Sequence, residues 1–258
     1  MPDDPAATAF WTAIAPSVYV HALKPFAVNT HMITSSAGFV LVDSGNNAAQ
    51  GRQIYDESLT LDRHLTPPSG LSETEAIARQ TGRCVALINT HAHYDHCFGN
   101  SVFADAGIPI YGHARHEEHL ATRGVLELVR YQHGLFEEGV EPGLWDDVTI
   151  AGASSIVENQ ERITLGSEVL TMRAFAPAHT TADLAVHVPW ANAWIVGDLV
   201  ETAGEPSIET DSDLAGWVRA LDWLLACGNT ATMYLPGHGK PAGPQDVREQ
   251  REWLRARM

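Results

Sequence analysis

The sequence predicts an α/β (α+β) protein in which two β-sheets pack face to face between outer helices, a four-layer αββα sandwich. The predicted elements fall into two successive halves of similar length, and each half is rich in strands before it turns helical. A sheet with one apolar face must bury that face against another layer, so two such halves favour a double sandwich. The 258 residues are 45% hydrophobic, which is enough for one domain spanning residues 1–258.

The first half begins with a β-meander and continues with helices that alternate with buried strands. The expected strands span residues 18–23, 29–34, 38–43, 84–88 and 108–111. The expected helices span residues 46–60, 72–81 and 113–133. Ser72 and Glu75 form a plausible capping box, and Gly134 ends the long helix. The run 84–88 is apolar without alternation, which indicates a central strand buried on both faces.

The second half follows a segment rich in Gly and Pro at residues 134–160, which we interpret as a mobile connection and a lid or insertion. The expected strands span residues 162–165, 168–174, 184–188, 193–197 and 230–235. The expected helices span residues 213–226 and the stretch after Pro244. The order of elements is therefore β-rich, α, β-rich, α.

Charge and cysteine usage narrow the possible partners. The chain carries 32 acidic and 16 basic residues, a formal charge of −16, so nucleic acid is a poor partner and a small-molecule substrate is expected. Neither a membrane-spanning segment nor a positively charged leader is visible in the sequence. The three cysteines are widely spaced and form no CxxC pair, which favours a reducing compartment. We expect a cytoplasmic protein.

The segment from His91 to His96, with sequence HAHYDH, carries the strongest chemical signal. It places three imidazoles and a carboxylate directly after a predicted strand. If the motif begins as extended chain, successive side chains point to opposite sides, so His91 and His93 point to the same side. A turn through Asp95 and His96 can then aim these two side chains at a second point about 3.5–4 Å away, the usual separation of a metal pair.

Three further donors come from distant segments, each near the end of a predicted strand. His179 lies in a turn, Asp198 follows the apolar run 193–197, and His238 lies in a Pro-Gly-His-Gly loop. A metal shell of nitrogen and carboxylate ligands needs such additional donors, because neither half of the HAHYDH motif is complete alone. The pattern therefore predicts a metal centre.

This arrangement of HxHxDH, a later His, a Gly-Asp after a strand and a Pro-Gly-His-Gly loop resembles the metallo-β-lactamase superfamily. The resemblance covers nearly the whole chain and implies the αββα metallo-β-lactamase fold with metals at one sheet edge. It implies that His91, His93 and His179 hold a first metal. It further implies that Asp95, His96 and His238 hold a second metal and that Asp198 bridges the two metals. The nitrogen and oxygen donors favour two zinc ions per chain, with iron or manganese as alternatives.

The function implied is that of a binuclear zinc-dependent hydrolase that cleaves an ester, thioester, lactone or amide bond by attack of a metal-bridging hydroxide. Asp95 would orient the hydroxide and pass a proton to the leaving group. Only 40 residues separate Asp198 from His238, which leaves no room for the domain that nuclease relatives insert there. The alternatives are a mononuclear iron enzyme resembling persulfide dioxygenases, a β-lactamase, and a non-catalytic metal-binding member.

Several residues around this motif receive supporting or structural roles. Asp43, at a strand end, is expected to steady the metal ligands, and Asp183 to anchor the turn that holds His179 by hydrogen bonds. Cys97 is expected to be a small buried filler. The aromatic residues expected to line a substrate groove are Phe26, Phe136 and Trp145.

Three more histidines, His113, His116 and His119, recur at helical spacing beside Glu117 and Glu118. Such a pattern can bind a metal, but it is far more often a solvated helix face. We therefore expect these histidines to lie at the surface and assign them no role.

Overall fold

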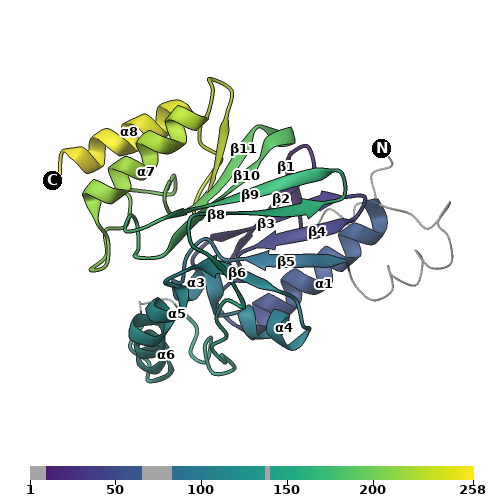
Figure 1. Cartoon of the computed structure of the whole chain (residues 1–258). Helices are drawn as coiled ribbons and strands as arrows, with labels where there is room; N and C mark the ends of the chain where they lie inside the picture. Colours follow the sequence, from purple (N-terminus) through teal and green to yellow (C-terminus); the bar gives the residue numbers. More distant parts are fainter. Residues whose placement is uncertain (1–9, 66–82, 137–139) are drawn as a thin grey trace.

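The computed structural model describes residues 10–65, 83–136 and 140–258, and it contains two β-sheets packed face to face (Figure 1). The first sheet has seven strands in the order β1-β2-β3-β4-β5-β6-β7, and the second has five in the order β12-β11-β10-β9-β8. The strands of the first sheet are β1 (Thr12–Ala15), β2 (Val18–Leu23), β3 (Val28–Ser35), β4 (Gly38–Val42), β5 (Cys84–Ile88), β6 (Ile110–His113) and β7 (Ser155–Val157). Those of the second are β8 (Gln160–Leu165), β9 (Glu168–Phe175), β10 (Asp183–Val188), β11 (Ala193–Gly197) and β12 (Met233–Pro236).

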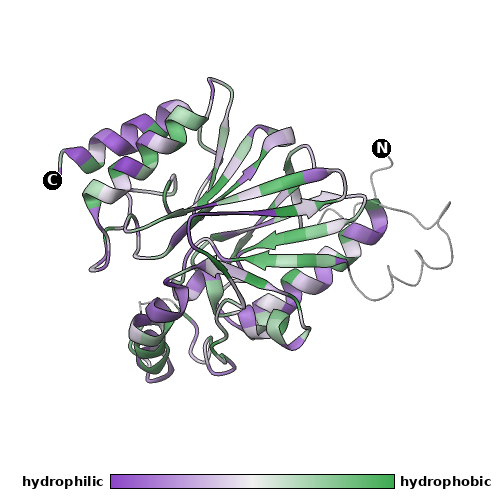
Figure 2. Cartoon of the chain, in the orientation of Figure 1, coloured by the Kyte–Doolittle hydropathy of each residue, from purple (hydrophilic) through white to green (hydrophobic). Residues whose placement is uncertain are grey.

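Helices cover the outer face of each sheet. Along the first sheet lie α1 (Ala48–Leu65) and α4 (Asn100–Asp105), and along the second lie α7 (Leu214–Cys227) and α8 (Pro244–Arg255). Both α7 and α8 turn hydrophilic residues outward (Figure 2). The predicted αββα sandwich is confirmed.

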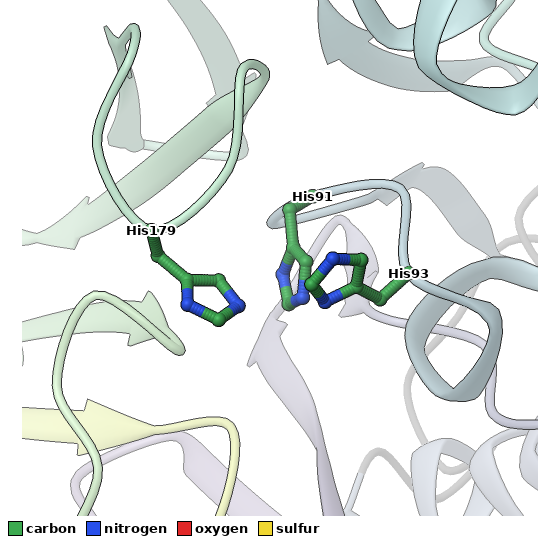
Figure 3. Close-up of side chains that lie close together, drawn as sticks. All are labelled: His91, His93 and His179. Atoms are coloured by element: carbon green, nitrogen blue, oxygen red, sulfur yellow. The ribbon is translucent and has the colours of Figure 1, made fainter. Parts of the chain in front are cut away.

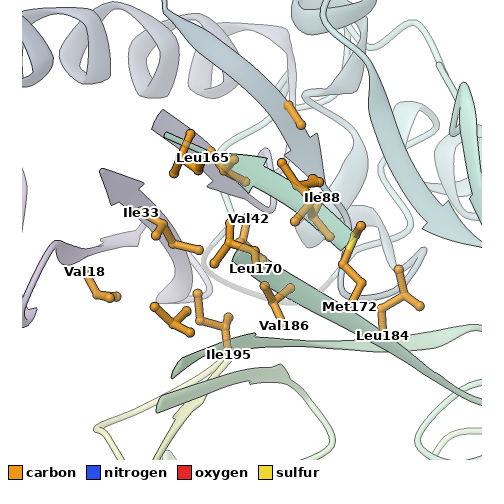
Figure 4. Packing of buried hydrophobic residues seen from close by; sticks show 14 of the residues in the cluster. Val18, Ile33, Val42, Ile88, Leu165, Leu170, Met172, Leu184, Val186 and Ile195 are labelled. Carbon is orange, nitrogen blue, oxygen red and sulfur yellow. The ribbon is translucent and has the colours of Figure 1, made fainter. Parts of the chain in front are cut away.

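Strand alternation divides the core into three layers. In β4, Val40 and Val42 point into the space between the sheets, whereas Phe39 and Leu41 point toward α1 and α4. Residues from both sheets, including Ile88 and Leu170, fill the central layer (Figure 4). This packing fixes the two sheets against each other, so loops at the same edge of the sandwich are held together.

The prediction of one long α-helix at residues 113–133 is wrong at its start, where a strand ends, and in its middle, where the chain forms a π-helical turn. His113 is the last residue of β6, where it pairs with Val157 of β7, so the helical segment begins only at His116. The segment comprises α5 (His116–His119), a π-helical turn at Leu120–Gly124 and α6 (Val125–Gln132). Tertiary strand pairing overrides the helical periodicity here. The helix expected at 72–81 lies outside the described residues.

The connection expected to be mobile at 134–160 contains buried residues in the part that the structure describes. Trp145 and Val148 are buried, and they join Ala92, Phe98 and Leu120 in a separate hydrophobic cluster. β7 and the first residue of β8 also lie within this range. At Trp145 and Val148 the segment is therefore packed against α3 and α6, whereas the side chain of Leu135 is exposed.

None of the helices in the described part of the chain has the length and apolar character needed to cross a membrane.

Candidate metal centre

The HAHYDH motif leaves β5 as extended chain and then turns helical. His93 has φ −70° and ψ 150°, and the short helix α3 (Tyr94–Cys97) starts immediately after it. His91 and His93 therefore lie on the extended part, whereas Asp95 and His96 lie on the helical turn. This change of backbone conformation aims the two pairs at adjacent points, as the sequence predicted.

The distant donors arrive on loops at the same edge of the sandwich. His179 lies in the turn between β9 and β10, Asp198 follows β11, and His238 follows β12. The amide of Leu184 donates to the carbonyl of Thr90 over 2.6 Å, which ties β10 to the start of the motif. Gly197 has a φ of +52°, and a Cβ there would lie 2.6 Å from the Cβ of Thr90, so β11 approaches β5 through a position that requires glycine.

One group of possible ligands consists of three imidazoles from two elements. The rings of His91, His93 and His179 turn toward one another (Figure 3). Their centroids lie 4.7 Å apart for His91 and His93, 5.1 Å for His91 and His179, and 5.0 Å for His93 and His179. One ligand atom from each lies within 4.8 Å of the others, and all three residues are buried.

A second group lies beside the first and shares Asp198 with it. Asp95, His96 and His238 also bring one ligand atom each within 4.8 Å. The Oδ2 atom of Asp198 lies 3.5 Å from Nε2 of His96 and 3.6 Å from Nε2 of His238. The same oxygen lies 3.8 Å from Nε2 of both His91 and His179. A single carboxylate oxygen thus faces both groups.

The donor atoms fit a metal pair because they lack other partners. Among the described residues, no hydrogen-bond partner is present for the buried Nε2 atoms of His91, His96 and His179, nor for Oδ1 of Asp198. Buried polar atoms without partners are costly in a folded protein. Their convergence on two adjacent points is what imidazole and carboxylate ligands of a metal pair require.

The two groups differ in charge. Burial lowers the pKa of His91, His93 and His179, and neighbouring imidazoles lower it further. At His96 and His238 burial acts in the same direction, but the carboxylates of Asp198 and Asp95 outweigh it. They raise the pKa of His96 well above its usual value and that of His238 to about 9. The first group is therefore neutral at neutral pH, whereas the second holds protons that a metal would displace.

Asp43 and Asp183 lie behind the candidate ligands, Asp43 in contact with His96 and Asp183 in contact with the turn after His179. Oδ2 of Asp43 lies 2.8 Å from Nδ1 of His96 and accepts the Thr90 hydroxyl hydrogen bond over 2.7 Å. Asp183 accepts from the backbone amide and hydroxyl of Thr180 over 2.8 and 2.9 Å, which closes the turn that carries His179. Burial raises the pKa of Asp183 to about 8 against the effect of these hydrogen bonds.

A cleft of about 500 Å³ opens onto the donors. Phe26 lines it, together with Tyr94 and Tyr131. Phe136 and Trp145, expected to line the same groove, are not among its described lining residues. Trp145 is 2% exposed and stacks on Tyr131 with ring centroids 4.5 Å apart, and Phe136 packs against Trp145. These two rings support the cleft wall from behind instead of forming it.

Sequence reasoning assigned no role to three residues next to the first group, His119, Arg123 and Asp211. His113, His116 and His119 are all buried, so the expected solvated face is wrong for all three, and the ring of His119 lies 5.4 Å from that of His93. Asp211 and Arg123 complete the neighbourhood. Histidines at i and i+3 give the same pattern on an exposed and on a buried helix face, so the sequence held no signal to separate them.

Comparison with known proteins places this chain in a family. The sequence matches the metallo-beta-lactamase superfamily over residues 23–240. The chain belongs to this superfamily. Among curated proteins, Metallo-beta-lactamase IND-1 of Chryseobacterium indologenes is 22% identical over 233 residues, which cover 90% of this chain and 80% of that protein.

Solved structures of the superfamily share the fold. The metallo-beta-lactamase FIM-1 from Pseudomonas aeruginosa, in its mono-zinc form, superposes with a TM-score of 0.67 at 18% identity, covering 96% of this chain and 95% of FIM-1. A double mutant of the sec-alkyl sulfatase PisA1 superposes with a TM-score of 0.69 at 19% identity, covering 96% of this chain but 42% of the sulfatase. Members of the superfamily are mostly hydrolytic enzymes. At these identities the likeness establishes the fold of this chain.

Proposed function

We propose that this protein is a binuclear zinc-dependent hydrolase that cleaves an ester, thioester, lactone or amide bond. The observation that carries the proposal is the position of Asp198, whose Oδ2 atom lies 3.5–3.8 Å from donors of both groups. A carboxylate in that position suits a bridging ligand between two cations. Each group supplies three further donors, so each cation would have four protein ligands and would take water or substrate as a fifth.

Zinc fits the chemistry of these donors. Five imidazoles and two carboxylates make up the set, and no thiolate is among them. Such nitrogen and oxygen ligands suit zinc, although iron and manganese accept similar ligands. When bound, a zinc pair would supply a water molecule whose pKa is lowered to about 7 and an electrophile for the substrate carbonyl.

Asp95 is the residue we assign to proton handling. Its Oδ2 lies 3.2 Å from Nε2 of His238 and 3.8 Å from Nε2 of His96. Burial raises the pKa of Asp95, but both imidazoles counter this effect and the net pKa is lowered. The carboxylate therefore stays ionised at neutral pH. In that state it can accept a hydrogen bond from the attacking water, orient it, and hold its proton for the leaving group.

The shape and charge of the cleft favour a small substrate. A volume of about 500 Å³ is within the usual range for small-molecule sites. One wall is aromatic, formed by Phe26, Tyr94 and Tyr131. Other positions carry the carboxylates of Glu127, Glu201, Glu205 and Glu209 and the guanidinium groups of Arg123 and Arg130. An aromatic wall beside charged groups suits a substrate with an apolar part and a polar end.

A substrate panel tests the proposal. The zinc-loaded protein is assayed against lactones, thioesters, activated esters, β-lactams and phosphodiesters, with Asp95→Asn as the matched variant. We expect turnover in at least one carbonyl class, lost in Asp95→Asn while most of the metal stays bound. Zinc-independent turnover would overturn the proposal. Binding of a single iron per chain, with no hydrolysis of any substrate, would also overturn it.

A further inference from the structure

The partly buried carboxylate of Asp211 faces the first group of candidate ligands from outside. Its Oδ2 atom lies 3.9 Å from Nε2 of His93 and 3.6 Å from Nδ1 of His119. This oxygen and Nε2 of His93 are both buried without a hydrogen-bond partner among the described residues. Asp211 thus presents an acceptor to an imidazole donor that nothing else satisfies.

The other oxygen of Asp211 is held by Arg123. The guanidinium of Arg123 donates to Oδ1 of Asp211, to Oε2 of Glu209 over 3.0 Å and to Oε1 of Glu127 over 2.6 Å. Three carboxylates around one planar group fix its orientation, because each of its nitrogens donates in a set direction. With Oδ1 held in this way, Oδ2 faces His93 and His119.

We propose that Asp211 is a positioning residue that sets the tautomer and orientation of His93 for metal binding. The proposal rests on the proposed metal centre. An imidazole that binds a metal through one nitrogen carries its proton on the other, and a carboxylate that accepts this proton orients the ring and strengthens it as a ligand. Asp211 would keep the proton on Nε2 and leave Nδ1 of His93 for the first metal.

The proposed hydrogen bond joins Nε2 of His93 to Oδ2 of Asp211, and these two atoms lie 3.9 Å apart. The two atoms are roughly 1 Å beyond hydrogen-bond distance, a gap that a small rotation of the ring closes. His119, on α5, also faces Oδ2 of Asp211. Its Nδ1 lies 3.5 Å from the hydroxyl of Thr181, two residues beyond His179. Asp211 and His119 thus connect the segments that carry His93 and His179.

The test measures zinc affinity by chelator competition in the wild-type protein, Asp211→Ala and Asp211→Asn. The asparagine variant keeps the volume and one oxygen for Arg123, which guards against simple misfolding. We expect the first site to lose affinity by about 10- to 100-fold in both variants while the second is unchanged. The control is Glu118→Gln, which removes a carboxylate next to His119 that is exposed and paired with Arg115. It should leave both affinities unaltered.

Two spectroscopic readouts do not depend on turnover. Long-range ¹⁵N–¹H spectra of the metal-free protein should show His93 as the Nε2–H tautomer in the wild type and as a mixture in Asp211→Ala. The visible spectrum of the cobalt-loaded protein should change at the first site alone.

Unaltered first-site affinity and tautomer in both Asp211 variants would overturn the proposal, as would an equal loss at both sites. A third metal in the wild type that disappears in His119→Ala would also overturn it, because His93, His119 and Asp211 would then be ligands themselves. If the wild type binds no metal at all, the proposed function fails, and the tautomer of His93 still tests the role of Asp211.

Discussion

The carboxylate of Asp43 contacts His96 on the ring nitrogen that faces away from Asp198. Oδ2 of Asp43 lies 2.8 Å from Nδ1 of His96, while Nε2 of the same ring lies 3.5 Å from Asp198. The backbone amide of Thr90 also donates to Asp43 over 2.8 Å. His96 is therefore held between an orienting carboxylate and the proposed bridging one.

Replacing Asp43 by asparagine should weaken the second metal site. The neutral amide loses the charge that favours a proton on Nδ1 of His96, so Nε2 is no longer the preferred ligand atom. We expect zinc affinity at this site to fall by about 10- to 100-fold, measured by chelator competition. Asp56→Asn, an exposed position on α1, is the control. An unchanged second site in Asp43→Asn would show that Asp43 does not orient His96.

Zinc affinity should depend on pH differently at the two sites. The pKa of His238 is raised to about 9, so below that pH a proton occupies the nitrogen that the second metal needs. Affinity at the second site should rise by about tenfold per pH unit for each displaced proton, up to about pH 9. Zinc affinity at the first site should not change with pH above neutrality, because its imidazoles have a lowered pKa and carry no proton there. Equal slopes in zinc titrations at several pH values would contradict this difference.

Gly237→Ala should disrupt the second site without unfolding the protein. A Cβ at Gly237 would collide with Oδ1 of Asp198 and lie 2.7 Å from Cε1 of His96. Both side chains must then move, so we expect the metal content to fall from two ions toward one, measured by mass spectrometry. At Gly243 an added Cβ meets its nearest neighbour at an ordinary 3.7 Å, which makes Gly243→Ala the control. Full metal content in Gly237→Ala would rule out this geometry.

Asp183→Ala should destabilise the turn that carries His179. The amide of Thr180 would be left buried without its acceptor, at a cost of about 1–3 kcal/mol in the free energy of unfolding. Denaturant unfolding of the metal-free protein measures this cost. In the control Asp222→Ala, half-exposed ion pairs with Arg251 and Arg255 are lost, and the expected cost is at most about 1 kcal/mol for each pair. Equal losses in the two variants would contradict the role of Asp183.

The fold and the converging ligands could be predicted because local patterns determine them. HAHYDH is a compact motif after a buried strand, and His179, Asp198 and His238 each lie beyond a strand with a clear apolar pattern. Residues at strand ends on the same edge of a sandwich lie close together in space, even when they are far apart along the chain. For the same reason, the strand runs 18–23 and 193–197 match β2 and β11.

The remaining features depend on tertiary contacts that no local pattern encodes. Arg123 and Asp211 are 88 residues apart, and only the fold brings them together. His113 continues a helical periodicity but pairs as a strand residue with Val157. Trp145 lies in a segment rich in glycine, where aromatic residues are often exposed, and it is buried because Tyr131 and Phe26 meet it from other elements.

The proposed metal pair can be located in a crystal structure of the zinc-loaded protein with anomalous scattering recorded at the zinc edge. We expect two anomalous peaks about 3.5–4 Å apart, with the carboxylate of Asp198 coordinating both ions. A single peak, or two peaks with Asp198 bound to neither, would contradict the proposal.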